Sequence, residues 1–170
     1  YLIKDKLKDN SDFPKKYVEF VHFGLTSQDI NSVTNTLCIK HGIENCLLPS
    51  LNSILDLIKH YSKIWDKTYM ISKTHGQSAI TTSMGKEFYV YYTRLEVQIN
   101  QLKEYRYSSK FGGAVGNLNA HYFCYPDINW DNELNNLLED EFKIKRNEYT
   151  TQVDHYDNLS EIFDILKRIN

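Results

Sequence analysis

The chain has 170 residues, of which 41% are hydrophobic and 25% charged, the balance of one globular domain of ordinary size. Its formal net charge of −2 argues against a nucleic-acid partner. No apolar run approaches the roughly 20 residues that cross a bilayer, so we expect no membrane association. Three cysteines without a CxxC pair predict a reduced protein of the cytoplasm. The chain begins without methionine and stops within an apolar helical pattern, so we interpret it as an internal segment.

The first half of the chain predicts one very long helix. Residues 1–7 read as the end of a helix, and a short helical or irregular segment is expected at 17–23. Thr26 and Ser27 then supply capping residues for a helix of about residues 28–65, which Pro49 is expected to kink. At 1.5 Å per residue this helix would be roughly 55 Å long, more than the roughly 40 Å diameter of a compact domain. We therefore expect it to pack in an oligomer. Its apolar residues recur at helical spacing: Ile30, Val33, Leu37, Leu47, Leu51, Ile54, Leu55, Ile58, Tyr61 and Trp65.

The second half predicts further helices joined by polar loops. A loop at 72–78 precedes a helix of about 80–107, and a glycine-rich connection follows at 111–117. A short helix is expected at 131–142, and the loop 149–152 opens a last helix that runs to residue 170. No strand pattern competes, so the predicted fold class is all-α, a bundle of long helices. The inward positions expected on the second long helix are Met84, Phe88, Tyr91 or Tyr92, Leu95, Ile99 and Leu102.

Reactive side chains collect where these helices begin. A helix start presents free amides and a partial positive charge, so the hydroxyls of Thr26 and Ser27 suit a carboxylate or phosphate ligand. The alternative is that both residues only cap the helix. His75 titrates near neutrality and can donate a proton to a departing nitrogen, although a loop histidine is more often a structural or surface residue. Gln152 offers an amide donor, or is simply another helix-start residue.

Other polar groups give weaker evidence of a catalytic or binding role. Residues 112–116 match neither a dinucleotide fingerprint nor a phosphate loop, and without a strand before them they predict a tight connection between helices. The acidic groups at 139–141, Asp154 and Asp157 are expected to form solvated faces. The histidines, including His41 and His60, show no zinc-ligand spacing, so we expect no metal site.

Four stretches, in order along the chain, together resemble one family. Residues 22–31 (HFGLTSQDIN) are similar to the first motif of the fumarase/aspartase superfamily. Residues 73–77 (KTHGQ), followed by Gly85-Lys86-Glu87, resemble its second motif, and the pair Gly76-Gln77 is similar to adenylosuccinate lyases. Residues 113–121 (GAVGNLNAH) and 149–152 (YTTQ) resemble the bacterial-type branch of that family.

The resemblance implies a helical subunit that assembles as a homotetramer with active sites shared between subunits. Residues 1–16 would end an N-terminal domain, and residues 17–170 would form part of the central helical bundle. The implied reaction is β-elimination of fumarate from adenylosuccinate and from succinylated AICAR, without a metal or organic cofactor. By position, His75 is the implied general acid, Thr26 and Ser27 would bind the succinyl carboxylates, and Gln152 would add a polar contact.

The departures from the family pattern are also informative. The Ser-rich mobile loop that carries the family's base has no match here and is expected beyond Asn170, so the segment alone should be inactive. Ser108-Ser109 lacks the Met-Pro and Lys-x-Asn context of that loop, and we reject it as the base. The sequence reads His155-Tyr156-Asp157 where the family often has Pro-His-Asp, which argues against a role for His155.

Two alternatives remain open. Another fumarate-releasing enzyme, such as argininosuccinate lyase, would use the same elimination, but Gly76-Gln77 argues against it. A non-enzymatic helical assembly module would explain the long apolar faces, but it leaves the polar stretches at the helix starts unexplained.

Overall fold

The computed structural model describes residues 1–170, and the chain folds as two compact units. Unit 1 consists of Tyr1–Leu37 and Arg106–Tyr156, and unit 2 of Cys38–Tyr105 and Asp157–Asn170. Helices dominate both units, which confirms the all-α fold class predicted from the sequence. None of the helices has the length and apolar character needed to cross a membrane.

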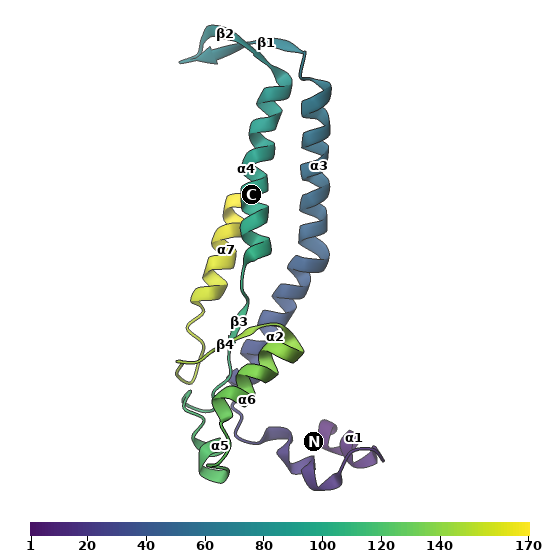
Figure 1. Ribbon diagram of the computed structural model, residues 1–170, viewed down its shortest axis with the longest axis vertical. Helices are drawn as coiled ribbons and strands as arrows, with labels where there is room; N and C mark the ends of the chain where they lie inside the picture. Colours follow the sequence, from purple (N-terminus) through teal and green to yellow (C-terminus); the bar gives the residue numbers. More distant parts are fainter. The chain divides into compact units, whose positions relative to one another are not determined.

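Unit 2 is built on three helices: α3 (Leu48–Ile64), α4 (Met84–Glu104) and α7 (Asp157–Ile169). Helices α3 and α4 run side by side, and α7 packs against α4 (Figure 1). Apolar residues recur at helical spacing on each of these helices, so their inward faces meet in one core. The buried apolar residues of this core are Leu51 and Leu55 on α3, Tyr92, Ile99 and Leu102 on α4, and Ile162 and Ile165 on α7.

A glycine sets the closest approach of α3 and α4. A Cβ atom on Gly85 would lie 2.2 Å from the carbonyl oxygen of Ser62 and 2.6 Å from the amide nitrogen of Asp66. No side chain fits there without moving backbone. Gly85 therefore lets the first turn of α4 lie directly against the end of α3.

A β-hairpin lies between α3 and α4, where the sequence predicted a loop and the start of a helix. Strands β1 (Tyr69–Thr74) and β2 (Gln77–Ser83) pair antiparallel, so the helix predicted from residue 80 begins only at Met84. Two physical causes explain the difference. The residues 80–82 (Ile-Thr-Thr) are β-branched and favour a strand. The side chain of Ser83 accepts a hydrogen bond from the Lys86 amide and caps α4 at that point.

The long helix predicted for residues 28–65 is confirmed with one modification. Helix α2 (Ser27–Gly42), a π-helical turn (Ile43–Leu47) and α3 keep the chain helical from residue 27 to residue 64. Pro49 has no amide hydrogen to donate to the preceding turn, and the backbone accommodates it by widening into the π turn instead of breaking.

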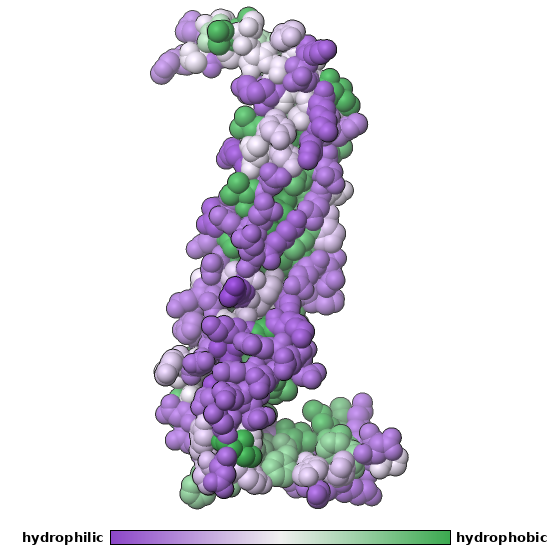
Figure 2. All heavy atoms as spheres, in the orientation of Figure 1, coloured by the Kyte–Doolittle hydropathy of each residue, from purple (hydrophilic) through white to green (hydrophobic).

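Unit 2 leaves large apolar side chains exposed along its helices. Ile54 is 48% exposed and Tyr61 38%, although both belong to the apolar face predicted from the sequence. Hydrophobic residues also lie at the surface over α3 and α4 in Figure 2. Within this chain the apolar face is only partly covered. The other large apolar residues exposed on these two helices are Leu57, Ile64, Tyr89, Val90, Tyr91 and Val97.

Unit 1 combines short helices with a small parallel sheet. Strands β3 (Ser108–Lys110) and β4 (Lys145–Asn147) pair in parallel, with Ser109 opposite Arg146. No strand is expected from the sequence before the glycine-rich connection, and β3 corrects this expectation. Three residues, Ser-Ser-Lys, are too few to show an alternating pattern. The helical elements of unit 1 are α1 (Leu2–Asp9), a 3₁₀ helix (Lys15–His22), the first part of α2, α5 (Asn119–Cys124), α6 (Trp130–Asn136) and a π-helical turn (Leu137–Glu141).

An aromatic cluster in unit 1 encloses His121. The ring centroid of His121 lies 5.1 Å from that of Phe23 and 5.0 Å from that of Trp130. His121 is 3% exposed, and its buried Nδ1 atom has no hydrogen-bond partner. Burial lowers the pKa of His121, and the negative charge of Asp29 opposes that effect only in part. The imidazole is therefore held in its neutral form more strongly than in water.

Candidate active site

The start of α2 is capped by a carboxylate. The amide of Thr26 donates to Oδ2 of Asp29 at 2.9 Å, and the amide of Asp29 donates to the carbonyl of Thr26 at 3.1 Å. The hydroxyls of Thr26 and Ser27 form no hydrogen bond. Thr26 is half-buried and Ser27 is exposed. Because Asp29 provides the cap, both hydroxyls remain available to a ligand.

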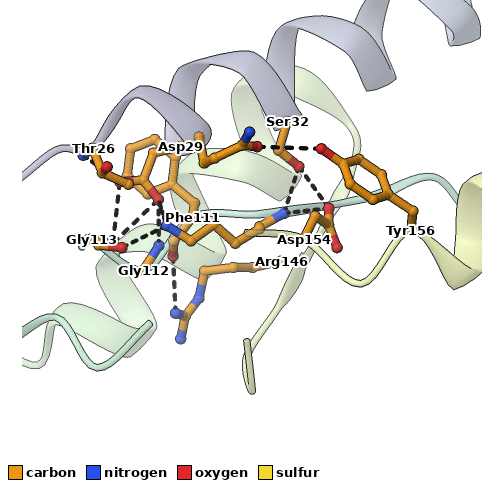
Figure 3. A network of polar contacts seen from close by, with 11 residues as sticks. Thr26, Asp29, Ser32, Phe111, Gly112, Gly113, Arg146, Asp154 and Tyr156 are labelled. Atoms are coloured by element: carbon orange, nitrogen blue, oxygen red, sulfur yellow. Dashed lines mark hydrogen bonds and ion pairs between the residues drawn. The ribbon is translucent and has the colours of Figure 1, made fainter. Parts of the chain in front are cut away.

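Asp29 is completely buried, and its carboxylate is fully hydrogen-bonded. Besides Thr26, it accepts hydrogen bonds from Nζ of Lys110 at 2.6 Å and from the amides of Gly112 at 2.9 Å and Gly113 at 3.2 Å (Figure 3). Burial alone would raise the pKa of Asp29. The hydrogen bonds from Lys110, Thr26 and Gly112 and the charge of Lys110 outweigh it, so the pKa lies below its ordinary value. Asp29 is therefore an ionised carboxylate inside the protein.

Lys110, at the end of β3, is the buried cation that pairs with Asp29, and it is 0% exposed. Its Nζ also donates to the carbonyl of Gly113 at 2.6 Å. Its backbone amide donates to Oγ of Ser32 at 3.0 Å and to Oδ2 of Asp154 at 3.2 Å. Lys110 thus contacts α2, the glycine-rich connection and the loop before α7 at once.

Asp154 completes this buried arrangement, which we call the Asp29–Lys110 network: Thr26, Asp29, Ser32, Lys110, Gly112, Gly113 and Asp154. Asp154 is 7% exposed and accepts hydrogen bonds from Oγ of Ser32 at 2.7 Å and from Nδ2 of Asn147 at 3.2 Å. The expectation that Asp154 belongs to a solvated face is therefore wrong. Two of its partners, Ser32 and Lys110, lie 122 and 44 positions away in the chain, and the sequence gives no sign of these contacts. Asp157 and residues 139–141 are exposed, as expected.

Gln152 is exposed, in the loop between β4 and α7. Its neighbours Thr151 and Val153 line a pocket of about 410 Å³ within unit 1. Thr150 also lines the pocket, and its Oγ1 atom is buried without a hydrogen-bond partner. The other residues lining the pocket are Gly116, Asn117, Glu148, Tyr149, Asp154 and His155.

Gly116 allows the glycine-rich connection to approach this loop. It has a φ of +86°, and a Cβ atom on it would lie 2.0 Å from the carbonyl oxygen of Thr150. Only glycine satisfies both conditions. The expectation that residues 112–116 form a tight connection is thus confirmed, with a close contact that the sequence did not reveal.

His75 lies in unit 2, at the tip of the β1–β2 hairpin. His75 (φ +53°) and Gly76 (φ +75°) are the two turn residues between the paired Thr74 and Gln77. Positive φ at both positions is typical of the type I′ turns that close two-residue hairpins. The imidazole is exposed and makes no hydrogen bond. Thr26, Ser27 and Gln152 therefore belong to unit 1, where the Asp29–Lys110 network joins their segments, whereas His75 belongs to unit 2.

Two further residues considered from the sequence, Ser109 and His155, lie near other residues of the fold. Ser109 is completely buried, and its hydroxyl contacts the carbonyl of Ser32 at 3.4 Å. His155 is exposed, and its Nδ1 lies 4.0 Å from the Asp154 carboxylate. No three His, Cys, Asp or Glu side chains lie close enough together to hold a metal ion. Asp29, Ser32, Lys110 and Asp154 are the polar residues of the site region that the sequence did not single out.

The chain is helical, and its candidate residues lie at a helix start, at the tip of a hairpin and in a loop that Gly116 supports. Residues 1–170 match a family model described as "Lyase", and the chain belongs to that family. Its curated relatives include the adenylosuccinate lyases of Dictyostelium discoideum, 42% identical, and Escherichia coli (strain K12), 34% identical. Both matches cover 100% of this chain and 37% of the relative. The resemblance to adenylosuccinate lyases read from the sequence motifs is confirmed.

Solved structures agree on the fold. The chain is similar to the 3-carboxy-cis,cis-muconate lactonizing enzyme from Pseudomonas putida, with a TM-score of 0.73 and 22% identity over 98% of this chain and 37% of that one. It is also similar to a fumarate lyase from Mesorhizobium sp. BNC1, with a TM-score of 0.69 and 18% identity over 97% of this chain and 41% of that one. At these identities the likeness concerns the fold alone. The chain spans about 37% of the length of the curated relatives it matches.

Proposed function

We propose that the protein containing this chain is an adenylosuccinate lyase. It would release fumarate from adenylosuccinate to give AMP, and from succinylated AICAR to give AICAR, without a metal or organic cofactor. The observation that carries the proposal is the match of the whole chain, at 42% and 34% identity, to relatives of that name. The roles proposed for individual residues rest on the motif resemblance.

The reaction is a β-elimination. A base removes a proton from the carbon next to a carboxylate, the electron pair of that bond forms the double bond of fumarate, and the carbon–nitrogen bond breaks. We assign His75 as the general acid that protonates the leaving nitrogen. Its exposed position on a hairpin tip supports this role, because the imidazole can enter a site completed by other segments. We assign no base among the residues of this chain.

Thr26 and Ser27 would bind the carboxylates of the succinyl group. Their hydroxyls form no other hydrogen bond, and they stand at the positive end of α2. Negative charge develops beside a carboxylate when the proton leaves, so fixed donors there lower the barrier. The exposed amide of Gln152 would add one further polar contact.

The exposed apolar residues on α3 and α4, including Ile54 and Tyr61, support assembly with other copies of the chain. We propose a cytoplasmic homotetramer whose active sites combine residues from different subunits. In that assembly, residues 1–16 would end an N-terminal domain and residues 17–170 would belong to the central helical bundle. Thr26 and His75 of one chain would then serve different sites.

Fumarate release by the complete protein tests the proposal. Adenylosuccinate, succinylated AICAR and argininosuccinate would be supplied separately, and fumarate measured by its ultraviolet absorbance. We expect release from the first two substrates only. Release from argininosuccinate alone would place the protein in another branch of the superfamily, and no release from any of them would favour a non-enzymatic assembly module.

A further inference from the structure

The start of α2 carries a charge that conflicts with its proposed ligand. The carboxylate of Asp29 touches the backbone of the residue proposed to bind the substrate, since Oδ2 accepts from the Thr26 amide at 2.9 Å. The proposed substrate group is a dicarboxylate. An uncompensated negative charge at this position would repel it and cancel the positive end of the helix.

The carboxylate of Asp29 cannot avoid the conflict by taking up a proton. It is completely buried and accepts hydrogen bonds from three backbone amides, those of Thr26, Gly112 and Gly113. These amides stabilise the ionised form, and because donors already face both oxygens, a proton added to either oxygen would displace one of them. The compensating charge must therefore come from another side chain.

Lys110 provides that charge. Its ammonium lies 2.6 Å from Oδ1 of Asp29, and neither side chain is exposed to solvent. Because the two opposite charges lie so close together, their effects at Thr26 largely cancel, and burial lets salt screen the pair much less than an exposed one. The ammonium also donates a hydrogen bond to the Gly113 carbonyl at 2.6 Å, and this second contact holds the ammonium beside Asp29 (Figure 3).

We propose that Lys110 is a positioning residue that neutralises Asp29 and so keeps the start of α2 attractive to a dicarboxylate. Asp29 holds the Thr26 backbone in place, and Lys110 removes the electrostatic penalty of that arrangement. Lys110 does not touch the substrate. This role rests on the proposed function, because it presumes that the succinyl group binds at Thr26 and Ser27.

The test compares two ligands in the complete protein at pH 8, far above the lowered pKa of Asp29 in the wild type. Dissociation constants of fumarate and of AMP would be measured for the wild type, Lys110→Met, Lys110→Gln and the double variant Asp29→Asn/Lys110→Met. The matched control is Lys4→Met, which removes the exposed Lys4–Glu19 ion pair of the same unit.

We expect Lys110→Met to weaken fumarate binding about tenfold or more, because one unit charge near the ligand is no longer compensated. AMP binding should change about twofold or less, since AMP lacks the dicarboxylate. The double variant should recover most of the fumarate affinity, and Lys4→Met should change neither ligand. Lys110→Gln keeps a donor to Asp29 without the charge, so we expect the same loss of fumarate binding from it. This variant keeps the test possible if Lys110→Met does not fold.

Equal losses of fumarate and AMP binding would overturn the inference, because a merely structural role of Lys110 would affect both ligands. A double variant as weak as Lys110→Met would also overturn it. A wild-type protein that releases no fumarate from adenylosuccinate would overturn the proposed function instead, so the two failures are distinguishable.

Discussion

Replacing Lys110 by methionine should destabilise unit 1 locally by about 3 kcal/mol. Removing one partner of a buried ion pair typically costs about 3–5 kcal/mol, because the other charge stays buried without compensation. The lower end applies here, since Asp29 keeps the amides of Thr26, Gly112 and Gly113 as donors. The carbonyl of Gly113 loses its contact with Nζ of Lys110 as well.

Hydrogen exchange of the complete protein measures this effect at the residues concerned. The amides of Gly112 and Gly113 are protected by Asp29, so a loss of about 3 kcal/mol should speed their exchange about 100-fold. A peptide from α4, in unit 2, serves as an internal reference, and Lys4→Met serves as the exposed-pair control. If exchange at both glycines stayed within about threefold of the wild type, the buried pair would contribute little to this network.

Three further perturbations test other parts of the structure. Gly116→Ala should cost about 2 kcal/mol or more and loosen the loop of Gln152, because the new Cβ atom would meet the Thr150 carbonyl at 2.0 Å; unchanged exchange in residues 149–153 would contradict this. Gly85→Ala should lower the melting temperature, although alanine normally favours a helix, because its Cβ atom would lie 2.2 Å from the Ser62 carbonyl; a higher melting temperature would show that α3 and α4 can separate without cost. His121→Gln should flatten the pH dependence of stability. Burial lowers the pKa of His121, so the unfolded chain binds the proton more tightly, and the stability present above about pH 6.5 is lost as the pH falls toward the lowered pKa; an unchanged melting-temperature slope between about pH 5 and 7 would refute this.

The long helices could be predicted from the sequence because their signal is local. Leu51 and Leu55 recur at helical spacing and are buried as expected. The hairpin could not be predicted in the same way, because most residues of β1 and β2 are exposed on both faces. Without a buried face there is no apolar alternation to detect. The local signs of it are the two-residue turn at His75 and Gly76 and the β-branched residues 80–82.

The polar network shows the limit of sequence reasoning more clearly. Lys110 and Asp29 are 81 positions apart, and Ser32 and Asp154 are 122 apart. Nothing in the sequence separates Lys110 from the exposed lysines, or Asp154 from the exposed Asp157. The motif resemblance singled out the residues proposed to face the substrate, Thr26, Ser27, His75 and Gln152. It did not single out the buried charges that join the start of α2 to the loop of Gln152.

The most direct test of the account is the turnover of adenylosuccinate by the complete protein and its His75→Asn variant. Asparagine tolerates positive φ, and an Asn-Gly pair suits the hairpin turn, so this change removes the imidazole and keeps the turn. His41→Ala, at an exposed histidine of α2, is the matched control. We predict that His75→Asn lowers turnover by about 100-fold or more, with the oligomer intact by size-exclusion chromatography and the control unchanged. Near-normal turnover in His75→Asn would contradict the assignment of His75 as the general acid.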